Sequence, residues 1–160
     1  MYERDTALIA TPIGGVRLSS DADRITAIRI EPDTTGSVAP MTAALCMAVE
    51  QLNQWFAGER YDFDLPLAPA ATPRGQALRD GMVGIDYGDT MSYGALSRQL
   101  GSSPRAMGQA CARNPFPIVV PCHRVLNADG SLGAYSGGDG PATKQWLLDH
   151  EQRHRTGTTI

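Results

Sequence analysis

The feature of this sequence best suited to chemistry is a cysteine followed directly by a histidine. Cys122 and His123 stand in the segment Pro121-Cys122-His123-Arg124-Val125, and the run Asn114-Pro115-Phe116-Pro117-Ile118-Val119-Val120 comes just before it. Each proline fixes its own backbone φ and restricts the residue before it, so the segment is stiff. A thiol reacts as the thiolate and needs a base or positive neighbours, which His123 and Arg124 can supply. The pattern indicates a positioned nucleophile, with a buried structural thiol as the alternative interpretation.

The adjacency of Cys122 and His123 sets a condition on this chemistry. Neighbouring side chains on a straight strand point to opposite faces, so the two groups can cooperate only in a turn or through a bridging water. The imidazole also needs a carboxylate to orient it. Glu151, beside His150 near the C-terminus, is the leading candidate.

The other cysteines and histidines favour neither a disulfide framework nor a metal site. Three widely spaced cysteines make an odd count. Cys46, on an apolar helical stripe, and Cys111, on a helix of small residues, are interpreted as core packing. No Cys-x-x-Cys spacing occurs, and His150 and His154 lack cysteine partners nearby in the sequence. We therefore expect no metal and no other cofactor.

The segment Arg105–Arg113 carries unusually small side chains. Ala106, Gly108, Ala110 and Ala112 leave the backbone of this helix open. Such a surface either lets another helix approach or lets the helix enter a narrow DNA groove, where arginines at its two ends can contact phosphates or bases. From the residues alone, packing against another helix is favoured.

Two different periodicities divide the chain into two parts. Residues 1–30 alternate apolar and polar, with turn signals such as Gly14-Gly15, which predicts a three-stranded meander. Residues 41–58 carry apolar side chains at helical spacing, and residues 61–67 alternate again as a further strand. We expect an α+β domain over residues 1–68, in which the helix covers one face of the sheet.

The second part of the chain is predicted to be mainly helical. Residues 69–72 form a linker, and a domain over residues 73–160 begins with Thr72 as helix cap and Pro73 in the first turn. Two of its helices are joined by a tight turn at Gly101, which is a helix-turn-helix candidate. Helices are expected over residues 73–84, 94–100, 104–112 and 141–153.

The composition limits the class of protein. A chain of 160 residues with 42% hydrophobic residues can fill one ordinary core or two small ones. A net charge of -3 excludes the strongly basic composition that would indicate nucleic-acid binding by charge alone. The N-terminal residues lack a signal-peptide pattern, and no apolar run approaches the roughly 20 residues that cross a bilayer. We expect a cytoplasmic protein without membrane contact.

Taken together, four ordered segments closely resemble the O6-alkylguanine-DNA alkyltransferases, also called methylated-DNA–protein-cysteine methyltransferases. The similarity is strong over residues 72–152 and holds only in outline before them. It implies a ribonuclease-H-like α+β domain followed by a winged-helix, helix-turn-helix domain. The segments are Arg105-Ala106-Met107-Gly108 through Arg113-Asn114-Pro115, Pro121-Cys122-His123-Arg124-Val125, Tyr135-Ser136-Gly137-Gly138, and Lys144 through Trp146-Leu147-Leu148 with His150-Glu151.

The resemblance implies a monomeric suicide repair protein that acts on double-stranded DNA. Cys122 would take the alkyl group from the O6 atom of a damaged guanine and keep it as a thioether, so that one molecule repairs one lesion. Because the target atom lies inside the duplex, the nucleotide must first be flipped out, here from the minor groove.

The resemblance also assigns roles to individual residues. His123 would act through a water as the base for Cys122, Glu151 would orient His123, and Asn114 would brace the turn. Tyr93 would rotate the nucleotide and assist proton delivery. The implied DNA contacts are Arg105, which fills the vacancy in the base stack, Ala106, Gly108, Gln109, Ala112, Arg113 and Tyr93. The implied substrate pocket contains Val125, Tyr135, Ser136 and Pro117.

Three other interpretations remain at this stage. An alkyltransferase-like protein would bind lesions without repairing them, but that group lacks the acceptor thiol that Cys122 provides. A cysteine hydrolase using Cys122 and His123 would turn over repeatedly without DNA. A winged-helix regulator built on residues 94–112 would bind selected DNA sequences, with Cys122 only structural.

Overall fold

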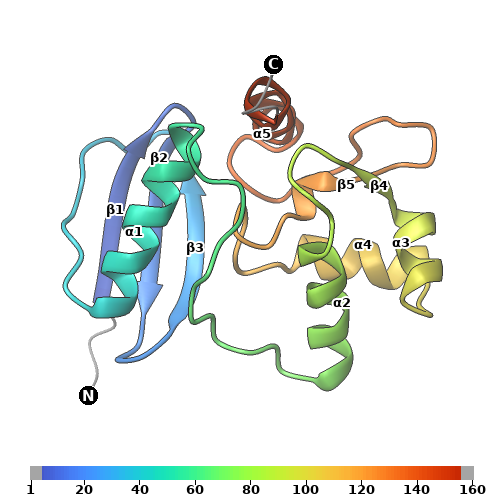
Figure 1. Cartoon of the computed structure of the whole chain (residues 1–160), viewed down its shortest axis with the longest axis horizontal. Coiled ribbons are helices and arrows are strands. Elements are labelled where there is room, and N and C mark those ends of the chain that lie inside the picture. The colour runs from blue at the N-terminus through green and yellow to red at the C-terminus, as the bar shows by residue number, and fades with distance from the viewer. Residues whose placement is uncertain (1–4, 156–160) are drawn as a thin grey trace. The chain divides into compact units, whose positions relative to one another are not determined.

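The computed structural model describes residues 5–155. The chain divides into two compact units between Ala68 and Pro69, and each is described by itself. Figure 1 shows a sheet with one helix in the N-terminal unit and mostly helices in the C-terminal unit. The expected α+β fold class is confirmed.

The N-terminal unit is built on an antiparallel meander in the order β1-β2-β3. The strands are β1 (Asp5–Thr11), β2 (Gly14–Ser20) and β3 (Ile25–Glu31). Gly14 has φ +99°, and a Cβ there would lie 2.5 Å from the Pro32 backbone, so this turn requires glycine. The predicted three-stranded meander is confirmed.

Helix α1 (Ala43–Phe56) packs on this sheet (Figure 1). The Thr42 hydroxyl accepts the Leu45 N–H and caps the helix. The buried face includes Leu45, Leu52 and Trp55. Cys46 was expected in the core but is exposed, because it lies on the side of α1 opposite this buried face.

The prediction of a strand over residues 61–67 is wrong. A single isolated bridge joins Leu67 to Ile25, and it does not extend into a ladder. Pro66 has no N–H, and the Gln51 side chain binds both the N–H and the carbonyl of Asp64. Three backbone groups that a strand could use for pairing, two of Asp64 and one of Pro66, are therefore occupied or missing.

The C-terminal unit contains the four expected helices, α2 (Pro73–Val83), α3 (Tyr93–Gln99), α4 (Pro104–Ala112) and α5 (Pro141–His154). Thr72, Ser92 and Ser103 cap the first three through their hydroxyls. A 3₁₀ turn, η1 (Cys122–Arg124), leads into β5 (Val125–Leu126), which pairs in parallel with β4 (Met91–Ser92). Among residues 5–155, no helix has both the length and the apolar character needed to cross a membrane.

Candidate active site

The backbone before Cys122 is held in a tight path by Asn114. The Asn114 amide nitrogen donates to the Val120 carbonyl at 2.9 Å and to Sγ of Cys122 at 3.2 Å, while its oxygen accepts the Phe116 N–H. Ile118 has φ +75° and is buried. A β-branched residue in this region costs about 1–3 kcal/mol, so the surrounding packing must impose the conformation.

Cys122 and His123 lie in the 3₁₀ turn η1, so the turn that cooperation requires is present. Nε2 of His123 lies 2.9 Å from Oε2 of Glu151, a residue of α5. An ionised carboxylate can only accept, so Nε2 carries the proton and Nδ1 of the neutral ring carries the lone pair. Burial lowers the pKa of His123, and the charges of Arg124 and Lys144 lower it further against the opposing effect of Glu151. The imidazole is therefore neutral near pH 7.

Arg124 was expected to provide positive charge for the thiol, but the structure directs it to the carboxylate. Its Nε and Nη2 donate to Glu151 at 2.9 and 2.7 Å, and Nη1 donates to the Ile85 carbonyl at 2.6 Å. Burial favours the protonated carboxyl, but contact with His123 and Arg124 outweighs burial and lowers the pKa of Glu151 to about 2. Arg124 and His123 therefore share one ionised, buried carboxylate.

The positive charge that acts on the thiol comes instead from Lys144. This completely buried side chain donates to the carbonyls of Val125 and Leu132, and its Nζ lies 5.8 Å from the centre of the Tyr93 ring. Burial raises the pKa of Cys122, whereas the Asn114 hydrogen bond and the Lys144 charge act to lower it. Sequence reasoning gave Lys144 no role, although it is the only lysine in the chain.

A cavity of about 350 Å³ opens beside Cys122. Six of the residues expected at the site line it, together with the unexpected Cys111, Asn127 and Ala134. The six are Cys122, Tyr93, Gly108, Ala112, Tyr135 and Ser136. Pro117 and Val125 do not line it. Both are buried, and the Val125 carbonyl accepts a hydrogen bond from Lys144.

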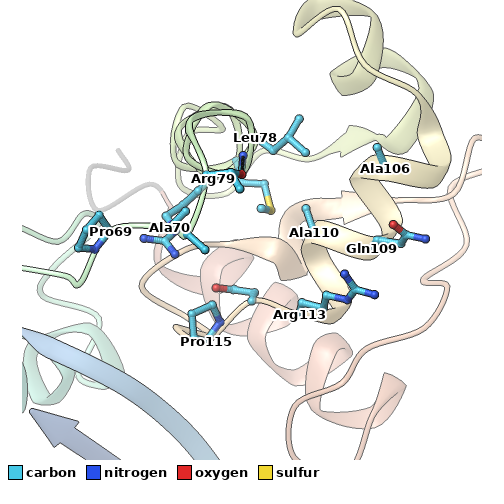
Figure 2. A pocket seen from close by; sticks show the side chains of 14 residues that line it. Pro69, Ala70, Leu78, Arg79, Ala106, Gln109, Ala110, Arg113 and Pro115 are labelled. Atoms are coloured by element: carbon cyan, nitrogen blue, oxygen red, sulfur yellow. Dashed lines mark hydrogen bonds between the residues drawn. The ribbon is translucent and has the colours of Figure 1, made fainter.

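Helix α4 presents an exposed ridge, while Met107 and Cys111 face the core. The two sides of this ridge border different cavities. On one side lies the Cys122 cavity, and on the other a cavity of about 490 Å³ between α4 and α2, shown in Figure 2. The ridge consists of four expected DNA-contacting residues, Arg105, Gln109, Ala112 and Arg113.

The small residues of α4 are not all explained by packing within the protein. A Cβ added at Gly108 would meet no atom within 4 Å, so the glycine leaves open space beside the Cys122 cavity. Ala106 and Ala110 border the cavity of Figure 2.

Within residues 5–155, no group of three or more His, Cys, Asp or Glu side chains is arranged to hold a metal ion.

Comparison with known proteins identifies the family. Residues 75–153 match the model of the 6-O-methylguanine DNA methyltransferase DNA-binding domain, and residues 6–69 match that of its ribonuclease-like domain. The chain is 41% identical over 146 residues to a DNA base-flipping protein of Thermus thermophilus, covering 89% of this chain and 97% of the relative. It is 39% identical over 153 residues to a methylated-DNA–protein-cysteine methyltransferase of Mycolicibacterium paratuberculosis, covering 91% of each.

The solved structures agree with the family models. The crystal structure of Mycobacterium tuberculosis OGT in complex with DNA matches with a TM-score of 0.79 and 37% identity over 92% of each chain. The resemblance seen in the sequence is thereby confirmed. The chain belongs to the 6-O-methylguanine DNA methyltransferase family.

Proposed function

We propose that this protein repairs O6-alkylated guanine in duplex DNA by moving the alkyl group to Sγ of Cys122. The observation that carries the proposal is the position of that sulfur. It borders a cavity of about 350 Å³ and accepts a hydrogen bond from Asn114, and His123 beside it in η1 is held by Glu151. Relatives named methylated-DNA–protein-cysteine methyltransferases and a DNA complex of a similar structure support the same activity.

The residues around Cys122 suit displacement at a saturated carbon. Neutral His123, acting through a water, takes the thiol proton at Nδ1, while Glu151 holds the ring and stabilises the imidazolium. The thiolate attacks the alkyl carbon, the bond from carbon to O6 breaks, and guanine leaves as it gains a proton. Burial raises the pKa of Tyr93 to about 12, so its phenol stays protonated and can supply that proton. The product is a thioether, and the protein acts once.

The geometry of α4 supports access to the base from the minor groove. Small residues border the two cavities that flank its exposed ridge, and Gly108 leaves space that packing does not use. A helix of this kind can approach the floor of a narrow groove. Arg105, exposed in the first turn of α4, fills the vacancy left by the flipped nucleotide. The Ser136 N–H and the wall formed by Tyr135 receive the guanine.

This proposal retains the remaining expectations from the sequence. Residues 1–68 form the ribonuclease-H-like domain, residues 69–72 the linker and residues 73–160 the DNA-binding, alkyl-accepting domain. The protein acts as a monomer in the cytoplasm, where a reducing environment keeps its three free cysteines as thiols. Lesion binding without repair is the second candidate, because one relative is named a DNA base-flipping protein. The acceptor position of Cys122 favours repair over binding alone.

Intact-protein mass spectrometry tests the proposal. Incubation with duplex DNA that carries O6-methylguanine should add one methyl group, about 14 Da, to the peptide with Cys122 and then stop. Cys122→Ser should gain no methyl group, while Cys46→Ser, which removes an exposed thiol in the other unit, should react like the parent protein. Continued turnover, or methylation of Cys122→Ser, would reject the mechanism.

A further inference from the structure

The Cys122 cavity is lined by a second thiol that the proposed repair reaction does not use. Cys111 comes from the last turn of α4, and Cys122 begins η1, yet both border the same space. Both are free cysteines and are almost fully buried, with exposed fractions of 7% and 3%. Cys46, the third cysteine, is exposed in the N-terminal unit.

The surroundings of the two sulfurs differ in a way that assigns them different reactivities. Sγ of Cys122 accepts the Asn114 amide hydrogen bond, whereas the Cys111 thiol donates to the Met82 sulfur at 3.5 Å. The positive charge of Lys144 favours the thiolate of both cysteines. Burial raises the pKa of both thiols, that of Cys111 to about 12. The amide hydrogen bond to Sγ of Cys122 stabilises a thiolate, whereas the bond from Cys111 to Met82 holds a thiol proton, so Cys122 reacts first and Cys111 is the thiol that can attack the oxidised Cys122 sulfur.

We propose that Cys111 and Cys122 form an oxidisable dithiol site, which a peroxide converts into an internal disulfide that blocks alkyl acceptance. The site follows from the shared cavity, and only its consequence for repair rests on the proposed function. A cavity of about 350 Å³ admits a peroxide, since a water molecule in the liquid occupies only about 30 Å³.

The reaction balances without any further component. The Cys122 thiolate attacks hydrogen peroxide, the O–O bond breaks, and a sulfenic acid and hydroxide form. The Cys111 thiolate then attacks the Cys122 sulfur, the S–O bond breaks, and a second hydroxide leaves. The two thiol protons and two hydroxides make two waters, while the sulfurs lose two electrons to the peroxide. In the disulfide the Cys122 sulfur is bonded to Cys111, so it cannot form the thiolate that attacks an alkyl carbon.

The experiment uses the full chain with Cys46→Ser, so that Cys111 and Cys122 are the only thiols. After treatment with hydrogen peroxide, the intact mass should fall by about 2 Da, and digestion should yield one peptide pair joined through these cysteines. Methyl uptake from O6-methylguanine duplex should fall in proportion to the disulfide and return with dithiothreitol. The matched variant Cys46→Ser, Cys111→Ser should show no fall in mass and should gain oxygen at Cys122.

Two outcomes would overturn the proposal. One is a Cys122 that gains two or three oxygens while Cys111 still reacts fully with iodoacetamide. The other is equal loss and equal recovery of methyl uptake with and without Cys111. If Cys46→Ser folds poorly, as circular dichroism would reveal, the same peptide mapping on the parent protein decides. Failure of the repair function is separate, because it would appear as absent methyl uptake in reduced protein that still forms the disulfide.

Discussion

Each unit of the chain contains a close arginine–glutamate pair, but the two pairs lie in different surroundings. Arg17 and Glu31 join β2 and β3 at 2.9 Å, with side chains 36% and 19% exposed. Arg124 and Glu151 in the C-terminal unit meet at 2.7 Å, with side chains 6% and 1% exposed. Water can replace the partner of an exposed charge, whereas a buried charge depends on its partner. The second pair therefore stabilises its unit, and through Glu151 it also holds the His123 ring.

The largest expected effect tests this contrast directly. Glu151→Gln leaves the Arg124 guanidinium buried without a counter-charge and should reduce the free energy of unfolding of the C-terminal unit by about 3–5 kcal/mol. The matched change Glu31→Gln should cost the N-terminal unit at most about 1 kcal/mol. Urea unfolding followed by fluorescence measures both, since Trp55 and Trp146 lie in different units.

Single-tryptophan variants, Trp55→Phe and Trp146→Phe, serve as the controls that assign each transition to its unit. Similar losses from Glu31→Gln and Glu151→Gln would show that burial does not distinguish the two pairs. An unchanged transition of Trp146 in Glu151→Gln would remove Glu151 from its structural role and, with it, the account of how His123 is held.

The next largest expected effect is the dependence of stability on pH. Acid should destabilise both units, and it should destabilise the C-terminal unit more. The pKa of Glu151 is lowered from 4.5 to about 2 in the folded protein, so the unfolded chain binds a proton first as the pH falls. Its stabilisation is complete above about pH 4.5 and is lost as the pH falls toward 2, a loss of about 3 kcal/mol. Unfolding measured by Trp146 should follow this course, and Glu151→Gln should flatten it.

Glu31 provides the internal reference for this titration. Its hydrogen bonds with Arg17 and Thr34 lower its pKa, so its contribution has the same sign. Because the pair is partly exposed, we expect at most about 1 kcal/mol over the same pH range. An acid transition of the N-terminal unit as large as that of the C-terminal unit would contradict the comparison.

The sequence predicts local features of both units well because local chemistry determines them. Thr72 and Pro73 predict the start of α2, and this helix begins at Pro73 with Thr72 as its cap. The need of an imidazole for a carboxylate also led to Glu151, which the structure places 2.9 Å from His123. These inferences depend on spacing and on residue type, which a sequence displays.

Features that depend on distant contacts were not predictable. The approach of α5 decides whether Arg124 binds the thiol or the carboxylate, and it also brings Lys144 to the Val125 carbonyl. The error over residues 61–67 has the same origin, since the Gln51 side chain of α1 occupies the Asp64 backbone groups. In each case a long-range partner takes hydrogen bonds that the local pattern assigns elsewhere.

The smallest expected effect concerns an exposed charge, and it separates stability from function. Arg105 lies on the α4 ridge in solvent, so Arg105→Ala should leave the Trp146 unfolding transition within about 0.5 kcal/mol of the parent protein. Repair of O6-methylguanine in duplex DNA should slow about tenfold, equivalent to about 1.4 kcal/mol, because the flipped state loses the side chain that fills the stack. Reaction with free O6-benzylguanine needs no flipping and should keep its rate.

Arg17→Ala is the control, a change of the same type in the N-terminal unit, and it should alter the rate of neither reaction. Equal slowing of both substrates by Arg105→Ala would show that this arginine acts on the thiol chemistry and not on the DNA.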